Sequence, residues 1–287
     1  MKRVAIQGFS GCFHEQAARD FYRSGKNEDI AIVECATFDD LFSALAQGRA
    51  DAAVMAIENT ISGGLLPNFD LLRKNPQKIK GEVYLQIHQN LMALPGQKME
   101  DIREVRTHYM AINQTRAFFE RKCPWIKMVE SEDTAKSAAD IARERLEGVG
   151  AVASSLAAQE FGLEILASQI ETYHDNFTRF LIVSDPRKAD FLRSLEQSDK
   201  ASLVFSLPHE EGSLSKVLTI LSFYSINLTK IQSLPVIGHE WEYMFYVDVT
   251  YQNLTRYRQS IDAIIPLTKE LKILGEYKEC TKYLINS

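Results

Sequence analysis

The chain of 287 residues lacks several features that would indicate particular protein classes. Its four cysteines, Cys12, Cys35, Cys123 and Cys280, are scattered, and no two stand at the spacing of metal ligands. This scatter fits reduced thiols better than a zinc site or a disulfide framework. No apolar run approaches the ~20 residues of a membrane-spanning helix, and Val4–Ile6 is too short for a signal-peptide core. We therefore expect a soluble, cytoplasmic protein with no membrane contact.

Basic residues are also too few for a general nucleic-acid binder, because 33 Lys and Arg face 38 Asp and Glu for a formal net charge of -5. Such proteins need a basic stripe that displaces counterions from phosphates. Gly8 and Gly11 alone do not have the spacing of a dinucleotide fingerprint, and no Walker sequence occurs. Neither nucleic acid nor a nicotinamide cofactor is expected.

Strand-like and helical patterns alternate through the first half of the chain. Apolar residues make up 45% of the sequence, enough for two or three compact units. The expected strands are Val4–Gln7, Ile30–Glu34, Ala52–Ile57, Val83–Ile87, Glu104–His108, Ile126–Glu130 and Gly150–Ser154. Alternation of this kind predicts parallel α/β sheets. Two such groups, with the chain returning through YHDNFTRFLIV, predict two lobes with a cleft between them.

A charge-rich run from Ser184 to Lys200 indicates a linker, and the pattern changes after it. The segments that follow are typical of the order β-α-β-β-α-β, which predicts a small ferredoxin-like unit. IGHE, residues 237–240, is expected to form a hairpin turn between its second and third strands.

Polar residues directly after strands are candidates for ligand contact, because ligands of open α/β sheets bind beyond the carboxyl ends of the strands. Glu58 and Asn59 follow one expected strand. Thr134 and Ser154 stand where helices should begin, and free N–H groups at a helix start can hold a carboxylate. The alternative for Thr134 and Ser154 is helix capping without a ligand.

His108 ends another strand and is followed by Gln114. It is a candidate for ligand contact, but a histidine at this position can equally be a satisfied partner of backbone groups.

The stretch Tyr173–Val183 places Thr178 and Arg179 at the entrance of an apolar strand. Adjacent strand residues face opposite sides, so only one of the two naturally points into the cleft, and packing or a salt bridge must hold the other. We expect Thr178 to face the ligand. The alternatives are a buried ion pair of Arg179 with Asp175, and Thr178 as an ordinary β-branched strand residue.

Taken together, these residues resemble the prephenate dehydratase family over almost the whole chain. Thr178, Arg179 and Phe180 match its Thr-Arg-Phe signature, and Glu58-Asn59 match its glutamate–asparagine motif. Further matches are Gly8 and Gly11, His108 and Gln114, Thr134-Ala135, and Ala153-Ser154. The sequence departs from the family with Phe9 and Ala56 in place of prolines, and with Asp133 in place of the serine of a Ser-Thr-Ala segment.

The resemblance implies a two-lobed, periplasmic-binding-protein-like catalytic unit, followed by a ferredoxin-like (βαββαβ) ACT regulatory domain. The catalytic unit would span residues 1–185, with one lobe of roughly 1–75 and 170–185 and another of 76–169. A linker would occupy 186–200 and the ACT domain 201–287. No helical chorismate mutase segment precedes the first strand, so we expect the monofunctional form.

The activity implied by the resemblance is that of a carbon–oxygen lyase that converts prephenate to phenylpyruvate in phenylalanine biosynthesis, without metal or organic cofactor. Catalysis would fall to Thr178, Arg179 and Phe180, with Thr178 donating a hydrogen bond to the departing hydroxyl. The substrate-binding residues would be Glu58, Asn59, Thr134, Ser154, Gln114 and His108. Arogenate dehydratase, or a non-catalytic two-lobed small-molecule sensor, is kept as an alternative.

Phenylalanine is the feedback effector that the resemblance implies at the ACT domain. Its contacts would come from Gly212, Ser213, Leu214, Asn227, Leu228 and Gln232. The family's Glu-Ser-Arg-Pro pattern is here Gln232-Ser233-Leu234-Pro235, so either a structural ion pair has been replaced by a neutral pair or the effector site is altered. Because effector pockets of ACT domains lie at interfaces, we expect a homodimer or homotetramer.

Overall fold

The computed structural model describes residues 1–26, 29–188, 197–236 and 242–280. The predicted hairpin turn at 237–240 and most of the predicted linker at 186–200 lie outside the described residues. Contacts divide the chain into two units. One unit consists of Met1–Gly64 with Val83–Phe180, and the other of Leu65–Glu82 with Leu181–Ser287.

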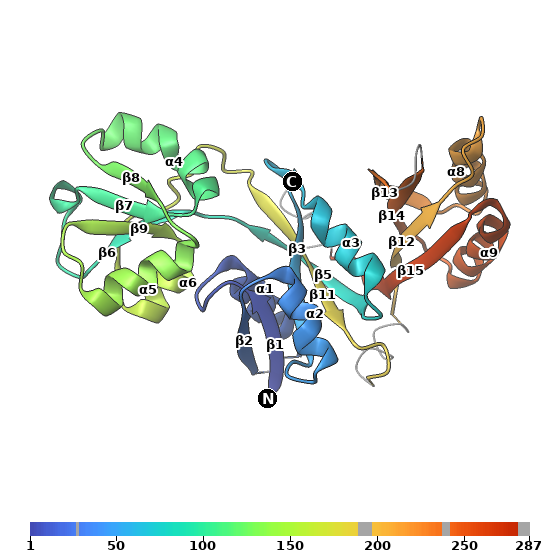
Figure 1. Ribbon diagram of the computed structural model, residues 1–287, viewed down its shortest axis with the longest axis horizontal. Helices are drawn as coiled ribbons and strands as arrows, with labels where there is room; N and C mark the ends of the chain where they lie inside the picture. The colour runs from blue at the N-terminus through green and yellow to red at the C-terminus, as the bar shows by residue number, and fades with distance from the viewer. Residues whose placement is uncertain (27–28, 189–196, 237–241, 281–287) are drawn as a thin grey trace. The chain divides into compact units, whose positions relative to one another are not determined.

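The first lobe of the first unit is built on parallel strands (Figure 1). β1 (Lys2–Gln7) lies between β2 (Ile30–Cys35) and β3 (Ala52–Asn59), and all three run parallel, as predicted. α1 (Phe13–Lys26) and α2 (Phe38–Ala46) contact this sheet. The middles of β1 and β3 are fully buried, as expected for parallel strands with helices on their faces.

Two further strands extend this sheet beside β3. β11 (Phe177–Ser184) lies between β3 and β5 (Lys78–Gln86), and both run from one unit into the other along the chain. A two-residue strand, β4 (Gly63–Gly64), pairs antiparallel with the end of β3. β11 contains Thr178 and Arg179, so the candidate residues begin a strand that neighbours the end of β3.

The second lobe has a five-stranded sheet of mixed direction, whereas the sequence predicted parallel sheets. β7 (Glu104–Thr107) runs parallel to its neighbours, but β6 (Asn90–Ala93) pairs antiparallel on both sides. The other strands and helices of this lobe are β8 (Lys127–Glu130), β9 (Val149–Ala153), β10 (Glu164–Ala167), the 3-10 turn η1 (Met99–Asp101), α4 (Tyr109–Lys122), α5 (Thr134–Glu144) and α6 (Ser155–Phe161). Its core includes Leu91, Val105, Phe119 and Val152.

The chain crosses between the lobes twice, and the two crossings are bonded to each other. The N–H of Ile87 donates to the carbonyl of Asn176 at 2.7 Å, and the N–H of Ile170 donates to the carbonyl of Gln89 at 2.9 Å. The buried Glu171 accepts the N–H of Gln89 at 2.8 Å through Oε2. The lobes are therefore joined by a short paired ribbon and not by two independent strands.

From residue 200 on, the second unit has the element order β-α-β-β-α-β that the sequence predicted. Its strands are β12 (Lys200–Ser206), β13 (Asn227–Pro235), β14 (Tyr243–Thr250) and β15 (Glu270–Tyr277), arranged in the order β13-β14-β12-β15 with antiparallel neighbours. The helices are α8 (Ser213–Phe223) and α9 (Leu254–Ile264), followed by the 3-10 turn η2 (Ile265–Leu267). Side chains of both α-helices share one core with the sheet, including Phe205, Val217 and Tyr257.

Residues 65–82 pack against these C-terminal strands as part of the same unit. They form α3 (Leu66–Lys74) and the start of β5, whose Ile79 pairs with Gly275 of β15. A Cβ atom on Gly275 would lie 2.2 Å from the carbonyl oxygen of Ile79, so only glycine allows this approach. The ammonium of Lys272 donates to the carbonyl of Asn75 at 2.8 Å, just after the end of α3.

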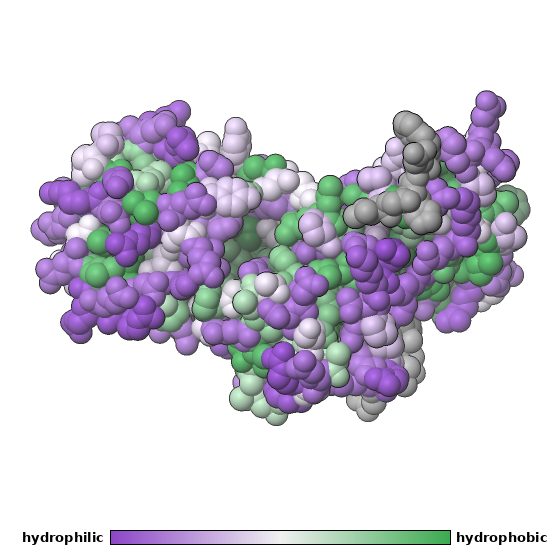
Figure 2. Space-filling model, in the orientation of Figure 1, coloured by the Kyte–Doolittle hydropathy of each residue, from purple (hydrophilic) through white to green (hydrophobic). Residues whose placement is uncertain are grey.

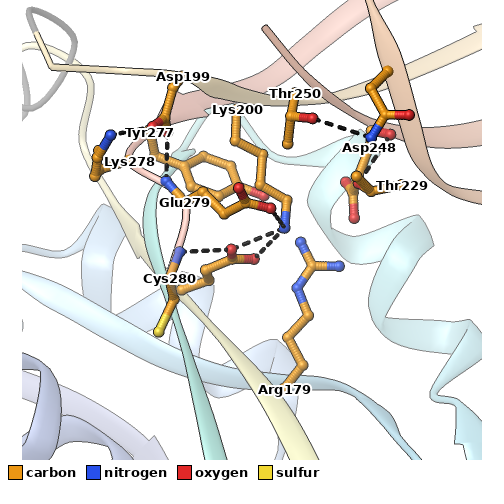
Figure 3. A network of polar contacts seen from close by, with 12 residues as sticks. Arg179, Asp199, Lys200, Thr229, Asp248, Thr250, Tyr277, Lys278, Glu279 and Cys280 are labelled. Atoms are coloured by element: carbon orange, nitrogen blue, oxygen red, sulfur yellow. Dashed lines mark hydrogen bonds and ion pairs between the residues drawn. The ribbon is translucent and has the colours of Figure 1, made fainter. Parts of the chain in front are cut away.

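A buried ion pair reinforces this packing. The Lys200 ammonium lies 2.8 and 3.1 Å from the two carboxylate oxygens of Glu82, and both side chains are at most 3% exposed. The N–H of Cys280 donates to the same carboxylate at 3.1 Å, and Glu279 lies 3.8 Å from Lys200 (Figure 3). These partners offset the large cost of removing both charges from water.

Hydrophilic residues cover much of the face seen in Figure 2, on both units. Among the described residues, no helix combines the length and apolar character that crossing a lipid bilayer requires.

Removing one partner of the buried pair is predicted to destabilise the second unit. Lys200→Met leaves the Glu82 carboxylate buried without its cation, so we expect the free energy of unfolding in urea to fall by about 3–5 kcal/mol. Lys278→Met is the matched control, because Lys278 forms an exposed pair with Asp199. Loss of this exposed pair is expected to lower the free energy of unfolding by less than about 1 kcal/mol.

The double variant Lys200→Met, Glu82→Leu replaces both charges with apolar groups and is expected to recover most of the lost stability. Equal losses for Lys200→Met and Lys278→Met would contradict the structural role given to the buried pair.

Candidate active site

Asn59 and Thr178 are bonded to each other where β3 ends and β11 begins. The Asn59 Nδ2 group donates to Thr178 Oγ1 at 2.9 Å and to Asn176 Oδ1 at 2.7 Å. Its Oδ1 accepts the N–H groups of Ile61 and Ser62 at 2.9 and 3.0 Å. The amide is therefore held at both ends. Because Thr178 accepts this bond, its own hydroxyl proton remains available for donation.

Arg179 pairs with a carboxylate next to Asn59. Its Nη1 atom lies 2.9 Å from Glu58 Oε1, and its side chain is 3% exposed. The guanidinium carbon lies 5.9 Å from the centre of the Tyr84 ring. Thr178 thus pairs with Asn59 while Arg179 pairs with Glu58, as the alternation of strand side chains predicts. The carboxylate that holds Arg179 in this unit belongs to Glu58 and not to Asp175.

Phe180 is 1% exposed and packs in the core of the first lobe. Its ring meets His14 edge-on with 5.0 Å between ring centres, and His14 Nε2 accepts the N–H of Ala56 at 3.3 Å. Burial lowers the pKa of His14 to about 4, so this ring is neutral near pH 7. Sequence analysis missed His14, whose only signal was its place on the helix after the first strand.

The glycine loop between β1 and α1 touches the second lobe. Gly11 has a φ of 85°, and a Cβ atom there would lie 2.8 Å from the Cα of Ala157 in α6. Ser154 is 1% exposed; its hydroxyl donates to the Gly11 carbonyl at 2.5 Å and accepts the N–H of Ala157 at 3.0 Å. The predicted capping by Ser154 is confirmed, while its contact with a ligand stays a prediction.

The cap of α5 is Asp133 and not Thr134, so the predicted cap was one residue too late. Asp133 Oδ1 accepts the N–H of Lys136 at 2.9 Å, and Thr134 is the first helical residue. A Cβ atom on Gly8 would lie 3.2 Å from Asp133 Oδ2. Burial raises the pKa of Asp133, against the lowering effects of nearby backbone N–H groups and His108. Sequence analysis noted Asp133 only as a departure from the family motif.

His108 and Gln114 are both engaged by neighbouring groups. His108 caps α4, and its Nδ1 accepts the N–H of Met110 at 3.3 Å, which is the backbone role considered as its alternative. Gln114 Oε1 accepts the side-chain N–H of Gln89 at 3.0 Å, and its carbonyl accepts the N–H of Thr172 at 2.8 Å. Gln114 is thus tied to both crossings between the lobes. Contact of either residue with a substrate stays a prediction.

The predicted effector residues lie on two elements of the second unit. Gly212–Leu214 begin α8, where Gly212 has a φ of 75°. Asn227, Leu228 and Gln232 lie on β13, at the edge of the sheet. Leu214 and Leu228 pack against the core of this unit, while Gln232 donates to the carbonyl of Ser233 at 3.0 Å. Their role as an effector site stays a prediction.

The site of the first unit therefore gathers neutral donors along one sheet edge. The ends of β1 and β3 and the start of β11 place the glycine loop, Asn59 and Thr178 there, and the glycine loop meets the beginnings of α5 and α6. Amides, a hydroxyl and helix N–H groups suit a ligand rich in carboxylates. Within the part of the chain that is described, no three His, Cys, Asp or Glu residues are placed to hold a metal ion.

Fold and site together define a two-lobed α/β protein whose polar edge suits a small acidic ligand. Residues 4–188 match the family model described as prephenate dehydratase. The bifunctional chorismate mutase/prephenate dehydratase of Aquifex aeolicus is 36% identical over 276 residues, which are 96% of this chain and 73% of that protein. Arogenate dehydratase 5 of Arabidopsis thaliana, a chloroplastic protein, is 34% identical over 96% of this chain and 67% of its own length.

Two solved structures share the fold over nearly the whole chain. Prephenate dehydratase from Arthrobacter aurescens, solved in complex with L-Phe, is 27% identical with a TM-score of 0.83, covering 98% of this chain and 91% of that one. GqqA, described as a quorum quenching acylase, is 28% identical with a TM-score of 0.84, covering 97% and 98%. The chain belongs to the prephenate dehydratase family.

Ser154→Ala is predicted to loosen the contact between the glycine loop and α6. The substitution removes the cap of α6 together with the donor to Gly11, so we expect the free energy of unfolding to fall by about 1–2 kcal/mol. Ser155→Ala is the matched control, because Ser155 is the exposed first residue of the same helix. It is expected to change stability by less than about 0.5 kcal/mol. Urea denaturation of both variants tests this, and an unchanged stability of Ser154→Ala would show that the bond to Gly11 contributes nothing.

Proposed function

We propose that this protein is a lyase that removes water and carbon dioxide from the ring of prephenate, or of its amino analogue arogenate. The bond from the ring to its carboxylate breaks, and its electron pair enters the ring as carbon dioxide leaves. The ring hydroxyl departs with its own bonding pair and takes up one proton to become water. Prephenate thus yields phenylpyruvate, and arogenate yields phenylalanine. Aromatisation of the ring drives the reaction, and the enzyme's task is to assist the poor leaving group.

The observation that carries this proposal is the Thr178 hydroxyl, fixed by Asn59 at the polar sheet edge of a chain that belongs to this family. With its oxygen occupied by the Asn59 amide, Thr178 donates its proton toward the departing hydroxyl. Thr178 is only 9% exposed, so the donated bond acts in a largely dry environment. One such donor, aimed at developing charge, lowers a barrier by about 3 kcal/mol.

Arg179 and Phe180 do not contact the reacting atoms in this proposal; they position Thr178. The ion pair of Arg179 with Glu58 fastens the start of β11 to the end of β3. The ring of Phe180 is fixed in the core against His14. These contacts set the direction of the strand and therefore of the Thr178 side chain.

The substrate's carboxylates are held by neutral donors of the second lobe. These are Thr134 at the start of α5 and the N–H groups at the start of α6, which Ser154 caps, with His108 at the start of α4 and Gln114 at the crossings. On the first lobe Asn59 positions Thr178, because both protons of its amide are donated within the protein, and Glu58 positions Arg179. Closure of the lobes then excludes water from the reacting ring. Residues 1–185 form the catalytic part in this proposal.

Replacing the Thr178 hydroxyl tests the mechanism. Thr178→Val removes the donor while keeping the branched shape, so we expect kcat to fall by about 10²–10³-fold on prephenate or arogenate. Thr178→Ser is the matched control and is expected to keep most of the activity, because it retains the hydroxyl. Turnover is followed through phenylpyruvate absorbance in alkali, or through phenylalanine by chromatography. Wild-type turnover in Thr178→Val would remove Thr178 from the mechanism, and a wild type inactive on both compounds would refute the function.

We further propose that residues 201–287 form an ACT domain that binds phenylalanine as a feedback inhibitor. Support comes from the β-α-β-β-α-β order of this region and from a related structure that was solved in complex with L-Phe. The effector contacts are those predicted at Gly212–Leu214 on α8 and at Asn227, Leu228 and Gln232 on β13. A homodimer or homotetramer provides the interface at which such a ligand is enclosed.

Binding of phenylalanine is expected to release or absorb measurable heat when the full-length protein is titrated in a calorimeter. The same titration with L-alanine is the control, because alanine has the same amino and carboxyl groups without the ring. We expect saturable heat with phenylalanine alone, together with slower turnover. Absence of heat at millimolar phenylalanine would count against phenylalanine as the effector.

A further inference from the structure

We propose that Asn176 is a further residue on which the reaction depends, a positioning residue that aligns the Thr178 hydroxyl through the side-chain amide of Asn59. The inference rests on the proposed function and adds a third member to the bonded pair of Asn59 and Thr178. Asn176 is 0% exposed, so it does not contact the substrate and acts only through these two neighbours.

The orientation of the Asn59 amide determines what Asn176 offers to it. Asn59 Oδ1 accepts the N–H groups of Ile61 and Ser62, so its Nδ2 group points the other way. Asn176 Oδ1 lies 2.7 Å from this nitrogen, and Thr178 Oγ1 lies 2.9 Å from it. Because the nitrogen only donates, Asn176 presents its oxygen there and not its own amide nitrogen.

The bond to Asn176 fixes the direction of the bond to Thr178. A side-chain amide nitrogen has two protons, and their directions are linked because the group is planar. One proton of Asn59 goes to Asn176, which leaves the other for Thr178 Oγ1 and for the carbonyl of Phe177 at 3.1 Å. Without the Asn176 oxygen, the Asn59 amide is free to tilt toward the Phe177 carbonyl. The Thr178 hydroxyl then loses its fixed direction.

The main chain is anchored at Asn176 and on both sides of it, so the side chain starts from a fixed point. The Asn176 carbonyl accepts the N–H of Ile87 at 2.7 Å, where the chain crosses between the lobes. The Thr60 hydroxyl donates to the carbonyl of Asp175 at 2.9 Å and accepts the N–H of Phe177 at 2.9 Å. A positioning residue needs such support, because a displacement of about 1 Å at a reacting group lowers the rate about a hundredfold.

The amide of Asn176 is not the most stable side chain for this position. Its Nδ2 group is buried and has no acceptor among the residues that the structure describes, and a buried donor without a partner lowers stability. Aspartate would offer Asn59 the same acceptor without that donor, but its charge would repel the carboxylates of the substrate. A neutral acceptor kept at the expense of stability is typical of functional sites.

Alanine variants in two backgrounds test this role in the full-length protein. Asn176→Ala removes the acceptor, so we expect kcat on prephenate or arogenate to fall by about 10–100-fold while KM changes by less than about threefold. In the Thr178→Val background, the same substitution is expected to lower kcat by less than about threefold. The reason is that the hydroxyl which Asn176 aligns is already absent, so the two losses do not add.

Asn90→Ala is the matched control. Asn90 is another buried asparagine of the same unit, and its Nδ2 group donates to the carbonyls of His88 and Ala153. Any loss of kcat that Asn90→Ala causes through the fold is expected to be the same with and without Thr178→Val.

Asn176→Asp tests the need for a neutral acceptor, and it provides a second measurement if the alanine variant does not fold. Burial without a cation raises the pKa of the introduced carboxyl, which is neutral like the amide below that pKa and charged above it. We therefore expect the ratio of variant to wild-type kcat/KM to rise at least about tenfold as the pH falls from about 8.5 to about 6, after subtraction of the rate without enzyme.

Other titratable groups on the segments around position 176 are common to both proteins, so their titration cancels in this ratio. They are Glu58, His88, Glu171, His174, Asp175 and Arg179.

Each outcome decides between the inference and the function on which it rests. Wild-type turnover of Asn176→Ala, or an equal loss of kcat in the two backgrounds, overturns the positioning role while the lyase function stands. A ratio for Asn176→Asp that does not rise toward low pH also overturns it. A wild type that converts neither prephenate nor arogenate overturns the function and the inference together.

Discussion

The hydrogen bond from Asn59 to Thr178 is the contact on which the site depends, because it joins the end of one strand to the beginning of another that follows more than a hundred residues later. It fixes the threonine oxygen and leaves the hydroxyl proton available for donation. The adjacent ion pair of Arg179 with Glu58 repeats this strand-to-strand link one residue later on β11 and one residue earlier on β3. Two consecutive residues of β3 thus hold two consecutive residues of β11, which explains why both dipeptides carry polar side chains beside buried apolar runs.

Much of the architecture was predictable, because the spacing of apolar residues within a short segment indicates which of its side chains are buried. The strands ending at Gln7 and Glu130, and the β-α-β-β-α-β order near the C-terminus, follow from runs of apolar residues between polar turns. The apolar run from Ala52 to Ile57 predicted β3, which continues two residues further, through Glu58 and Asn59. The direction of β6 was not predictable, because NLMA has no feature that distinguishes a parallel from an antiparallel partner. Pairing direction depends on contacts with β9 and β10, which are distant in sequence.

The sequence predicted which residues contribute to the site, but it did not predict which of them pair with one another. Glu58 and Asn59 were candidates because they follow an expected strand, and their match to a family motif supported this prediction. The pairing of Arg179 with Glu58 spans 121 residues, and only the folded sheet brings the two together. The capping role of Asp133 was missed because Thr134 is also a good cap, and local preference cannot separate adjacent candidates. The likeness to a quorum quenching acylase shows that the fold alone does not assign the chemistry.

The close approach of Gly275 to Ile79 has a consequence for dissecting this protein into fragments. Residues 65–82 belong to the C-terminal unit by their contacts, although they lie within the first third of the chain. A fragment that stops after the matched family region, at residue 188, would strip α3 and the start of β5 of their packing partners and expose Ile79, Glu82 and Phe69 to water. The two units are therefore interleaved in the chain, and a cut at the apparent linker does not separate them.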